Sequence, residues 1–112
     1  MSQLTIGRDD PRPPEVGRNA RAVEWLKAET VAAVGEALRA IAQGREDGVL
    51  DGLAQVVVAS YLLARRLGMP YARLDLKIDA LLDANVAQDH QIEHWYGDMS
   101  SLRTHRRNPR EV

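Results

Sequence analysis

Residues 53–64, with the sequence LAQVVVASYLLA, decide the fold class of this chain. The stretch is apolar on nearly every side, which is typical of a helix that is buried on several sides. Its flanking Ala and Leu residues and the glycine at position 68 favour a helix from about Arg45 to Leu67, although the three consecutive valines also suit a short strand. In a chain of 112 residues, such a helix lies at the centre of a bundle or in a subunit interface.

A second long helix is predicted ahead of this stretch. It begins near Asn19, a suitable N-cap residue, and ends at about Gln43, before Gly44. Apolar residues recur along it at helical spacing: Val23, Leu26, Val34, Leu38 and Ile41. Gly35, inside the helix, is expected to allow a neighbouring helix to approach closely, because glycine in a helix interior otherwise costs about 1 kcal/mol relative to alanine.

Shorter helices are predicted after residue 68. One begins at Pro70 and ends near Asn85, a second covers residues 88–96, and a last turn runs from Asp98 or Ser100 to about Arg106. No strand or hairpin signal outweighs these patterns. The predicted fold is therefore all-α: two long antiparallel helices with two or three shorter ones, completed by oligomerisation.

The domain prediction follows from the same pass along the chain. Residues 1–18 contain three prolines among charged residues and are expected to form an extended arm. Residues 19–106 are expected to form a single helical domain, and residues 107–112 a polar tail.

Composition excludes several classes of protein. The chain has no cysteine, so disulfides, thiolate metal sites and a cysteine nucleophile are excluded. The net charge of −1 argues against nucleic-acid binding through bulk positive charge. No run of about 20 apolar residues and no secretion signal are present, so we expect a cytoplasmic protein that does not span a membrane. P-loop, dinucleotide-binding and hydrolase-elbow motifs are also absent from the sequence.

Three carboxylates are the first candidate for chemistry. Glu29 and Glu36 are seven residues apart, about two helical turns, so they share one face of the first long helix. Asp51 lies near the start of the next helix, which folds back on the first. Carboxylates from facing helices bind Mg²⁺ or Mn²⁺ in helical bundles. The alternative is that Glu36 pairs with Arg39 on a solvated face and that Asp51 favours the helix N-terminus.

A histidine pair and a basic C-terminal segment are the other candidates. His90 and His94 flank Glu93 in an H-x-x-E-H pattern, and on a helix both could reach one Zn²⁺ ion. We expect only adventitious zinc binding there, because no substrate-binding strand is apparent. The basic residues at the C-terminus could neutralise phosphates or form a solvated, fraying end; they are Arg103, His105, Arg106, Arg107 and Arg110.

The segment 22–83 resembles the MazG-like family of all-α nucleoside triphosphate pyrophosphohydrolases. The likeness lies in the order of parts: a Glu-bearing helix ending in EAL, a Gly-containing turn, an Asp ahead of LAQVVV, and then RRLG-M. The stretch WYGDMSSL further resembles the ending of a small branch of short MazG-like proteins. The resemblance implies a homodimer or a dimer of dimers, and a nucleoside triphosphate ligand held through Mg²⁺ or Mn²⁺.

This chain departs from the family pattern of four Mg²⁺-binding carboxylates. The second-helix pair of the family falls on Gly48 and Asp51, so only the aspartate is kept. The first-helix pair falls either on Glu29 and Ala32 or on Thr30 and Ala33. Two hypotheses follow: a degenerate homologue acting as an oligomeric binding or regulatory module, or a divergent Mg²⁺-dependent pyrophosphohydrolase. In the second, Glu29, Glu36 and Asp51 would bind the metal, and Arg39 and Arg45 the phosphates.

Overall fold

The structure is a computed structural model that describes residues 13–88 and 90–109. Five α-helices follow one another in this part of the chain, with no strand between them, so the predicted all-α class is confirmed. The helices are α1 (Pro13–Gln43), α2 (Glu46–Arg66), α3 (Tyr71–Ala87), α4 (Gln91–Tyr96) and α5 (Asp98–Arg107). They form two compact units, Met1–Met69 and Pro70–Val112.

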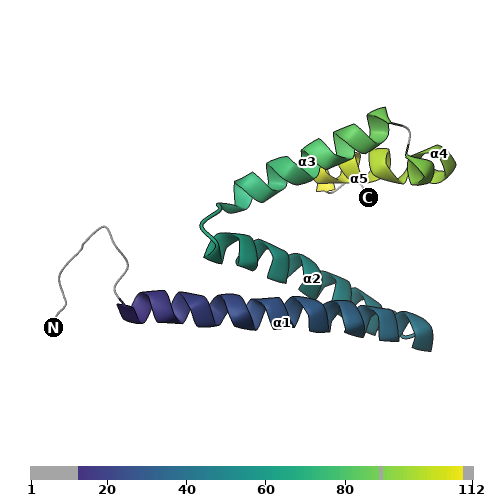
Figure 1. Ribbon diagram of the computed structural model, residues 1–112. Helices are drawn as coiled ribbons and strands as arrows, with labels where there is room; N and C mark the ends of the chain where they lie inside the picture. The colour runs from purple at the N-terminus through teal and green to yellow at the C-terminus, as the bar shows by residue number, and fades with distance from the viewer. Residues whose placement is uncertain (1–12, 89, 110–112) are drawn as a thin grey trace. The chain divides into compact units, whose positions relative to one another are not determined.

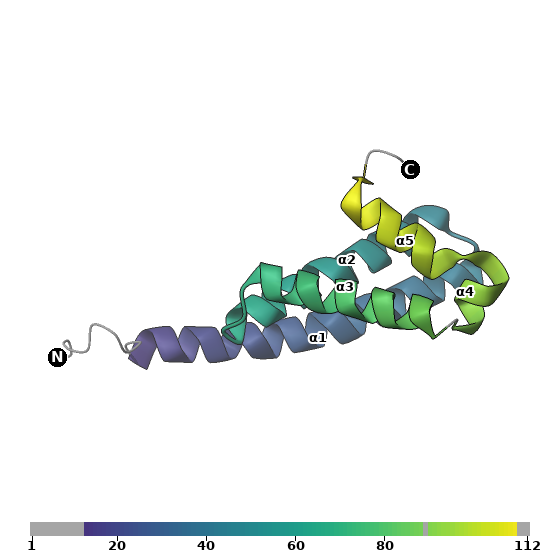
Figure 2. The same cartoon turned by 90° about the horizontal axis from the view of Figure 1, so that it is seen from above.

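The first unit is an antiparallel hairpin of α1 and α2, which lie side by side in both views (Figures 1 and 2). Gly44 ends α1 with a positive φ of 66°. The amide of Gly44 donates to the Ile41 carbonyl and the amide of Arg45 to the Ala40 carbonyl, so the turn closes as a Schellman motif. The turn is short, and α2 therefore returns directly along α1.

Helix α1 begins at Pro13, six residues ahead of the start expected at Asn19. Proline is tolerated in the first helical turn, because the amides there have no intrahelical acceptor. The expected extended arm is therefore helical over residues 13–18, and its residues 1–12 lie outside the described residues. Near the far end of the hairpin, the Asn19 side chain donates to the Arg66 carbonyl at 3.1 Å, so the first turns of α1 project beyond α2 (Figure 1).

Small residues fill the contact between α1 and α2. Among the described residues of these two helices, Leu26 is the one large side chain that is buried; the other buried residues are Ala33, Ala37, Ala40, Gly52, Ala59 and Ala64. A Cβ atom on Gly52 would lie 2.8 Å from the backbone nitrogen of Ala37, so the two helices touch backbone to backbone at this level. The expectation that Gly35 allows this close approach is wrong within the chain, because a Cβ there would meet nothing within 4 Å.

The second unit contains α3, α4 and α5. Gly68 ends α2 with a φ of 92°, and Pro70 precedes α3 as its N-cap. Gly97, at a φ of 67°, separates α4 from α5. Helix α5 packs on α3, and Leu82 is the one buried large apolar residue among the described residues of this unit.

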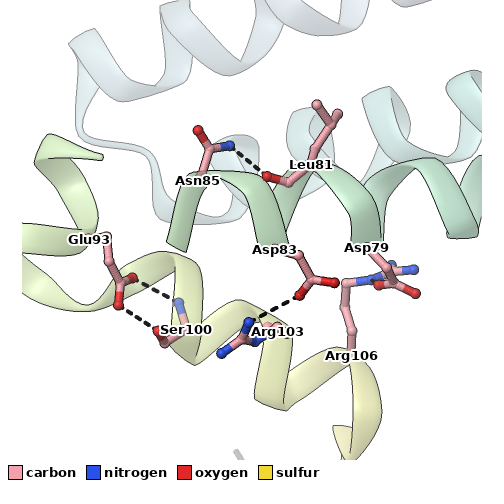
Figure 3. A network of polar contacts seen from close by, with 8 residues as sticks. All are labelled: Asp79, Leu81, Asp83, Asn85, Glu93, Ser100, Arg103 and Arg106. Carbon is pink, nitrogen blue, oxygen red and sulfur yellow. Dashed lines mark hydrogen bonds and ion pairs between the residues drawn. The ribbon is translucent and has the colours of Figure 1, made fainter. Parts of the chain in front are cut away.

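Charged side chains connect α5 to α3 (Figure 3). Arg106 donates from Nε to Asp79 at 2.7 Å, and Arg103 donates to Asp83 at 3.0 Å. Arg106 also reaches the carbonyl oxygen of Asp75 at 3.3 Å. Two arginines of the predicted basic tail are thus used inside the fold.

Among the described residues, α2 is the one helix that is long and apolar enough to cross a membrane by length and composition. Core helices of soluble proteins pass the same test, so one such helix does not establish a membrane span.

Candidate functional site

The three predicted carboxylates share one side of the α1–α2 hairpin, which we call the acid face and define by Glu29, Glu36 and Asp51. Glu29 lines a small groove together with Trp25 of α1 and with Gln55 and Leu62 of α2. Because residues of both helices line this groove, it identifies the flanks of α1 and α2 that lie on the same side of the hairpin. Glu36 follows Glu29 by two helical turns and Asp51 precedes Gln55 by one, so helical periodicity places both on this side.

The groove itself is shallow and partly aromatic. It encloses about 40 Å³ and is open to solvent, with Leu26, Val58 and Ala59 completing its lining. Trp25 at its rim is 61% exposed. The arrangement puts a flat aromatic surface, a carboxylate and a primary amide next to one another. Stacking and hydrogen bonding of a small planar ligand use such groups.

Glu36 is already engaged by two cations. Arg39, one turn further along α1, donates to Glu36 at 2.6 Å, and Arg45 in the turn donates to it at 3.3 Å. Arg45 is positioned for this because the Schellman turn brings residue 45 back against the end of α1, and it also donates to Gln43 at 2.7 Å. The two arginines predicted to bind phosphate thus lie at the acid face, and in this structure they neutralise a carboxylate.

The residues of one chain do not suit a bound Mg²⁺ ion. Within residues 13–88 and 90–109, no three His, Cys, Asp or Glu side chains gather closely enough to hold a metal. Octahedral Mg²⁺ is held mainly by carboxylate and phosphate oxygens, and one of the three candidate carboxylates is paired with guanidinium groups instead. The assignment of Glu29, Glu36 and Asp51 as ligands stays a prediction.

The histidine pair lies at the start of α4. His90 is the N-cap of this helix, and its Nδ1 accepts the amide of Ile92 at 3.2 Å. His94 lies inside the helix. Because His90 precedes the first helical residue and one of its ring nitrogens is occupied, the two rings do not form the regular i, i+4 pair of a zinc-protease helix. Adventitious zinc binding by this pair stays a prediction.

Glu93, between the two histidines, has a structural partner instead. Its carboxylate accepts the Ser100 hydroxyl at 2.5 Å and the Ser100 amide at 2.9 Å (Figure 3). These two hydrogen bonds, the hydroxyl first, hold the pKa of Glu93 below its ordinary value of 4.5. The carboxylate thereby caps the N-terminus of α5, a role that the H-x-x-E-H pattern does not reveal.

The MazG-like family model matches residues 16–99. The chain belongs to the MazG-like family. Comparisons with curated proteins and with solved structures gave no match. The family match covers α1 from residue 16 onward and all of α2, α3 and α4, and therefore includes Glu29, Glu36 and Asp51. The resemblance seen in residues 22–83 is confirmed. The acid face is therefore interpreted as part of a MazG-like protein.

Proposed function

We propose that this MazG-like protein is an oligomeric binding or regulatory module that has lost pyrophosphohydrolase activity. The observation that carries the proposal is the state of Glu36, which is held at 2.6 Å by Arg39 and at 3.3 Å by Arg45. A carboxylate with two guanidinium partners is a poor ligand for a divalent cation, because the cation would have to displace or approach both positive charges.

The sequence of the chain supports the same proposal. Gly48 and either Ala32 or Ala33 stand where the family pattern has carboxylates, so the negative charge available for Mg²⁺ is reduced. A fold is often inherited while the chemistry of its site is lost. The acid face would then serve for binding, with the groove beside Trp25 and Gln55 as its most defined feature.

A divergent Mg²⁺-dependent nucleoside triphosphate pyrophosphohydrolase is the second candidate. One observation favours it: Glu29, Glu36 and Asp51 lie on the same side of the hairpin, and Arg39 and Arg45 lie next to them. A triphosphate that attracted both arginines would release Glu36. This candidate requires further carboxylates or phosphate oxygens to complete the metal coordination.

In this proposal the protein acts in the cytoplasm as a homodimer or a dimer of dimers. Its balanced charge of −1 and the absence of cysteine are in keeping with that compartment. The proposed ligand of the acid face is a nucleoside triphosphate, with Mg²⁺ or Mn²⁺ as the cofactor only if the chain is active.

A thermal-unfolding series tests the proposal. The midpoint is measured with Mg²⁺, Mn²⁺ or Zn²⁺, each with and without a mixture of nucleoside triphosphates, because a ligand that binds the native state raises the midpoint by mass action. Pyrophosphate release is measured in the same samples. The proposal predicts no release and no midpoint shift that requires Mg²⁺ or Mn²⁺; a nucleotide shift without metal is compatible with a binding module.

The opposite results identify the alternatives. Pyrophosphate release that needs Mg²⁺ and is lost in Glu29→Gln would overturn the proposal in favour of the enzyme. Arg107→Gln serves as a control, because it removes one charge at an exposed position at the end of α5, in the unit of the chain that does not contain the acid face. A midpoint shift with Zn²⁺ alone that is lost in His94→Gln would place metal binding at the histidine pair.

A further inference from the structure

Arg45 occupies the space beside Gly48 that a side chain at position 48 would need. A Cβ atom on Gly48 would lie 2.6 Å from Nη1 of Arg45 and 3.2 Å from its Cζ, and at the first of these distances the two atoms would overlap. Gly48 stands where the resemblance places a carboxylate of the family pattern. In this chain a guanidinium group therefore lies where that metal-binding side chain would begin.

The other nitrogens of the guanidinium group hold it in this position. Nη2 of Arg45 donates to Oε2 of Glu36 at 3.3 Å, and Nε donates to Oε1 of Gln43 at 2.7 Å. The backbone adds to this constraint, because the Arg45 amide donates to the Ala40 carbonyl at 2.9 Å in the turn. Arg45 thus reaches Glu36 from the far side of the turn, whereas Arg39 reaches it from the next turn of the same helix.

Helix capping does not account for an arginine at position 45. Arg45 is the N-cap residue of α2, and its side chain makes no capping hydrogen bond. Arginine has no acceptor atom for the free amides of the first helical turn, and a positive charge is unfavourable at the N-terminus of a helix. The contact with Glu36 does account for it, because the guanidinium group neutralises a carboxylate there.

We infer that the Arg45 guanidinium group takes the place of the divalent cation at the acid face and excludes metal from this site. The inference rests on the proposed loss of pyrophosphohydrolase activity and assigns that loss to one residue. Glu36, Arg39 and Arg45 together carry a net charge of +1, so a divalent cation that enters among them is repelled. It would also need the Glu36 oxygens that the two arginines already occupy.

The missing carboxylate at position 48 and the arginine at position 45 are linked by this contact. Any side chain at position 48 would force Nη1 of Arg45 to move. A glutamate added there beside an intact Arg45 would give the guanidinium group a second acidic partner, because opposite charges this close attract strongly. Restoring a metal site therefore requires the removal of Arg45 as well as a carboxylate at position 48.

Arg45→Gln and the double variant of Arg45→Gln with Gly48→Glu test the inference. Mn²⁺ alone is titrated into the full chain, and the electron paramagnetic resonance signal of the free ion measures how much stays unbound. Removing one positive charge about 5 Å from a divalent cation strengthens binding about tenfold in water, and adding one negative charge does so again. The Mn²⁺ dissociation constant should therefore fall at least about tenfold in Arg45→Gln and about 100-fold in the double variant, relative to the wild-type chain.

Three further variants are the controls. Arg21→Gln makes the same change of charge at an exposed position of α1, about 22 Å along the helix from Glu36, and should change the Mn²⁺ dissociation constant less than about twofold. Arg45→Gln with Gly48→Ala adds the Cβ atom without the carboxylate and should bind like Arg45→Gln. Glu36→Gln, added to the double variant, should remove the gain, because it takes away a ligand of the acid face.

A side chain at position 48 also has to fit against α1, since a Cβ atom there would lie 3.0 Å from the Cβ atom of Ala40. Circular dichroism therefore checks that each variant is helical. If the double variant does not fold, Arg45→Gln keeps the test valid, because the Arg45 side chain is 47% exposed and its loss leaves the helix contact intact. In a second readout, Mn²⁺ should raise the thermal midpoint of Arg45→Gln and leave that of the wild-type chain unchanged.

Failure of the inference is distinguishable from failure of the proposed function. Mn²⁺ binding that is no tighter in Arg45→Gln than in the wild-type chain would overturn the inference alone, as would a gain in the double variant that Glu36→Gln does not remove. Pyrophosphate release from nucleoside triphosphates by the wild-type chain that requires Mn²⁺ and is lost in Glu36→Gln would overturn both.

Discussion

The α1–α2 hairpin and the α3–α5 unit use different interactions to join their helices. In the hairpin, Gly52 lies against Ala37, and small apolar residues bring two backbones together. In the second unit, Arg103 and Arg106 bind aspartates of α3, and Glu93 caps α5. The first kind of contact depends on shape and is insensitive to salt and pH, whereas the second depends on charge and is sensitive to both.

The largest expected effect comes from a substitution that disrupts the contact between α1 and α2. Gly52→Ala should destabilise the chain by about 1–3 kcal/mol, because the new methyl group would meet the Ala37 backbone, which cannot move without shifting α1. Gly35→Ala is the control at another interior helix position, where nothing lies within 4 Å, and it should stabilise by about 0.5–1 kcal/mol. Urea unfolding of both variants measures the difference. Equal effects would show that α1 and α2 do not touch at Gly52.

The second-largest effect is expected from a substitution that removes the charged contacts between α5 and α3 in the second unit. Arg106→Gln should cost about 1 kcal/mol, since the Arg106 side chain is only 22% exposed and binds both Asp79 and the Asp75 carbonyl. Arg107→Gln changes the same residue type next to it at an exposed position and should be nearly neutral. Hydrogen exchange of α5 amides measures the local loss of stability. Loss of equal size in both variants would contradict the assigned role of Arg106.

Acid should loosen the cap of α5 and leave the hairpin contact unchanged. Because hydrogen bonds from Ser100 lower the pKa of Glu93, this carboxylate contributes stability above pH 4.5 that is lost as the pH falls through its lowered value. An NMR titration of the Ser100 amide should follow this change. In Ser100→Ala the largest stabilising hydrogen bond is absent, so the pKa of Glu93 should return toward 4.5; an unchanged titration would contradict the cap.

Salt is expected to give the smallest difference. Raising NaCl to about 1 M shortens the screening length to about 3 Å and should weaken the exposed pair of Arg103 and Asp83 by less than about 1 kcal/mol. The contact of Gly52 with Ala37 carries no charge and should not respond. The change in amide exchange rate with salt is measured in α5 and in the middle of α2. Equal changes in the two regions would contradict this prediction.

Several features of the molecule could be predicted because their signals are local. Three helices end at a glycine with a positive φ: Gly44, Gly68 and Gly97. The positions of these helix ends can therefore be predicted from the sequence alone. The family resemblance likewise depended on the order of parts along the chain, and the match to residues 16–99 confirms it. The start of α1 lies six residues ahead of the position that the sequence predicts, because prolines generally break helices but the first helical turn accepts them.

The sequence by itself determined an all-α chain with two long helices and a MazG-like pattern, since composition, helical period and glycine positions are properties of neighbouring residues. Only the tertiary structure decided that Gly52, and not Gly35, is the point of close approach, that Arg45 turns back onto Glu36, and that Arg106 binds α3. Each of these depends on the rotation of one helix about its axis relative to the next. That rotation is set by packing between distant residues, and no local pattern encodes it.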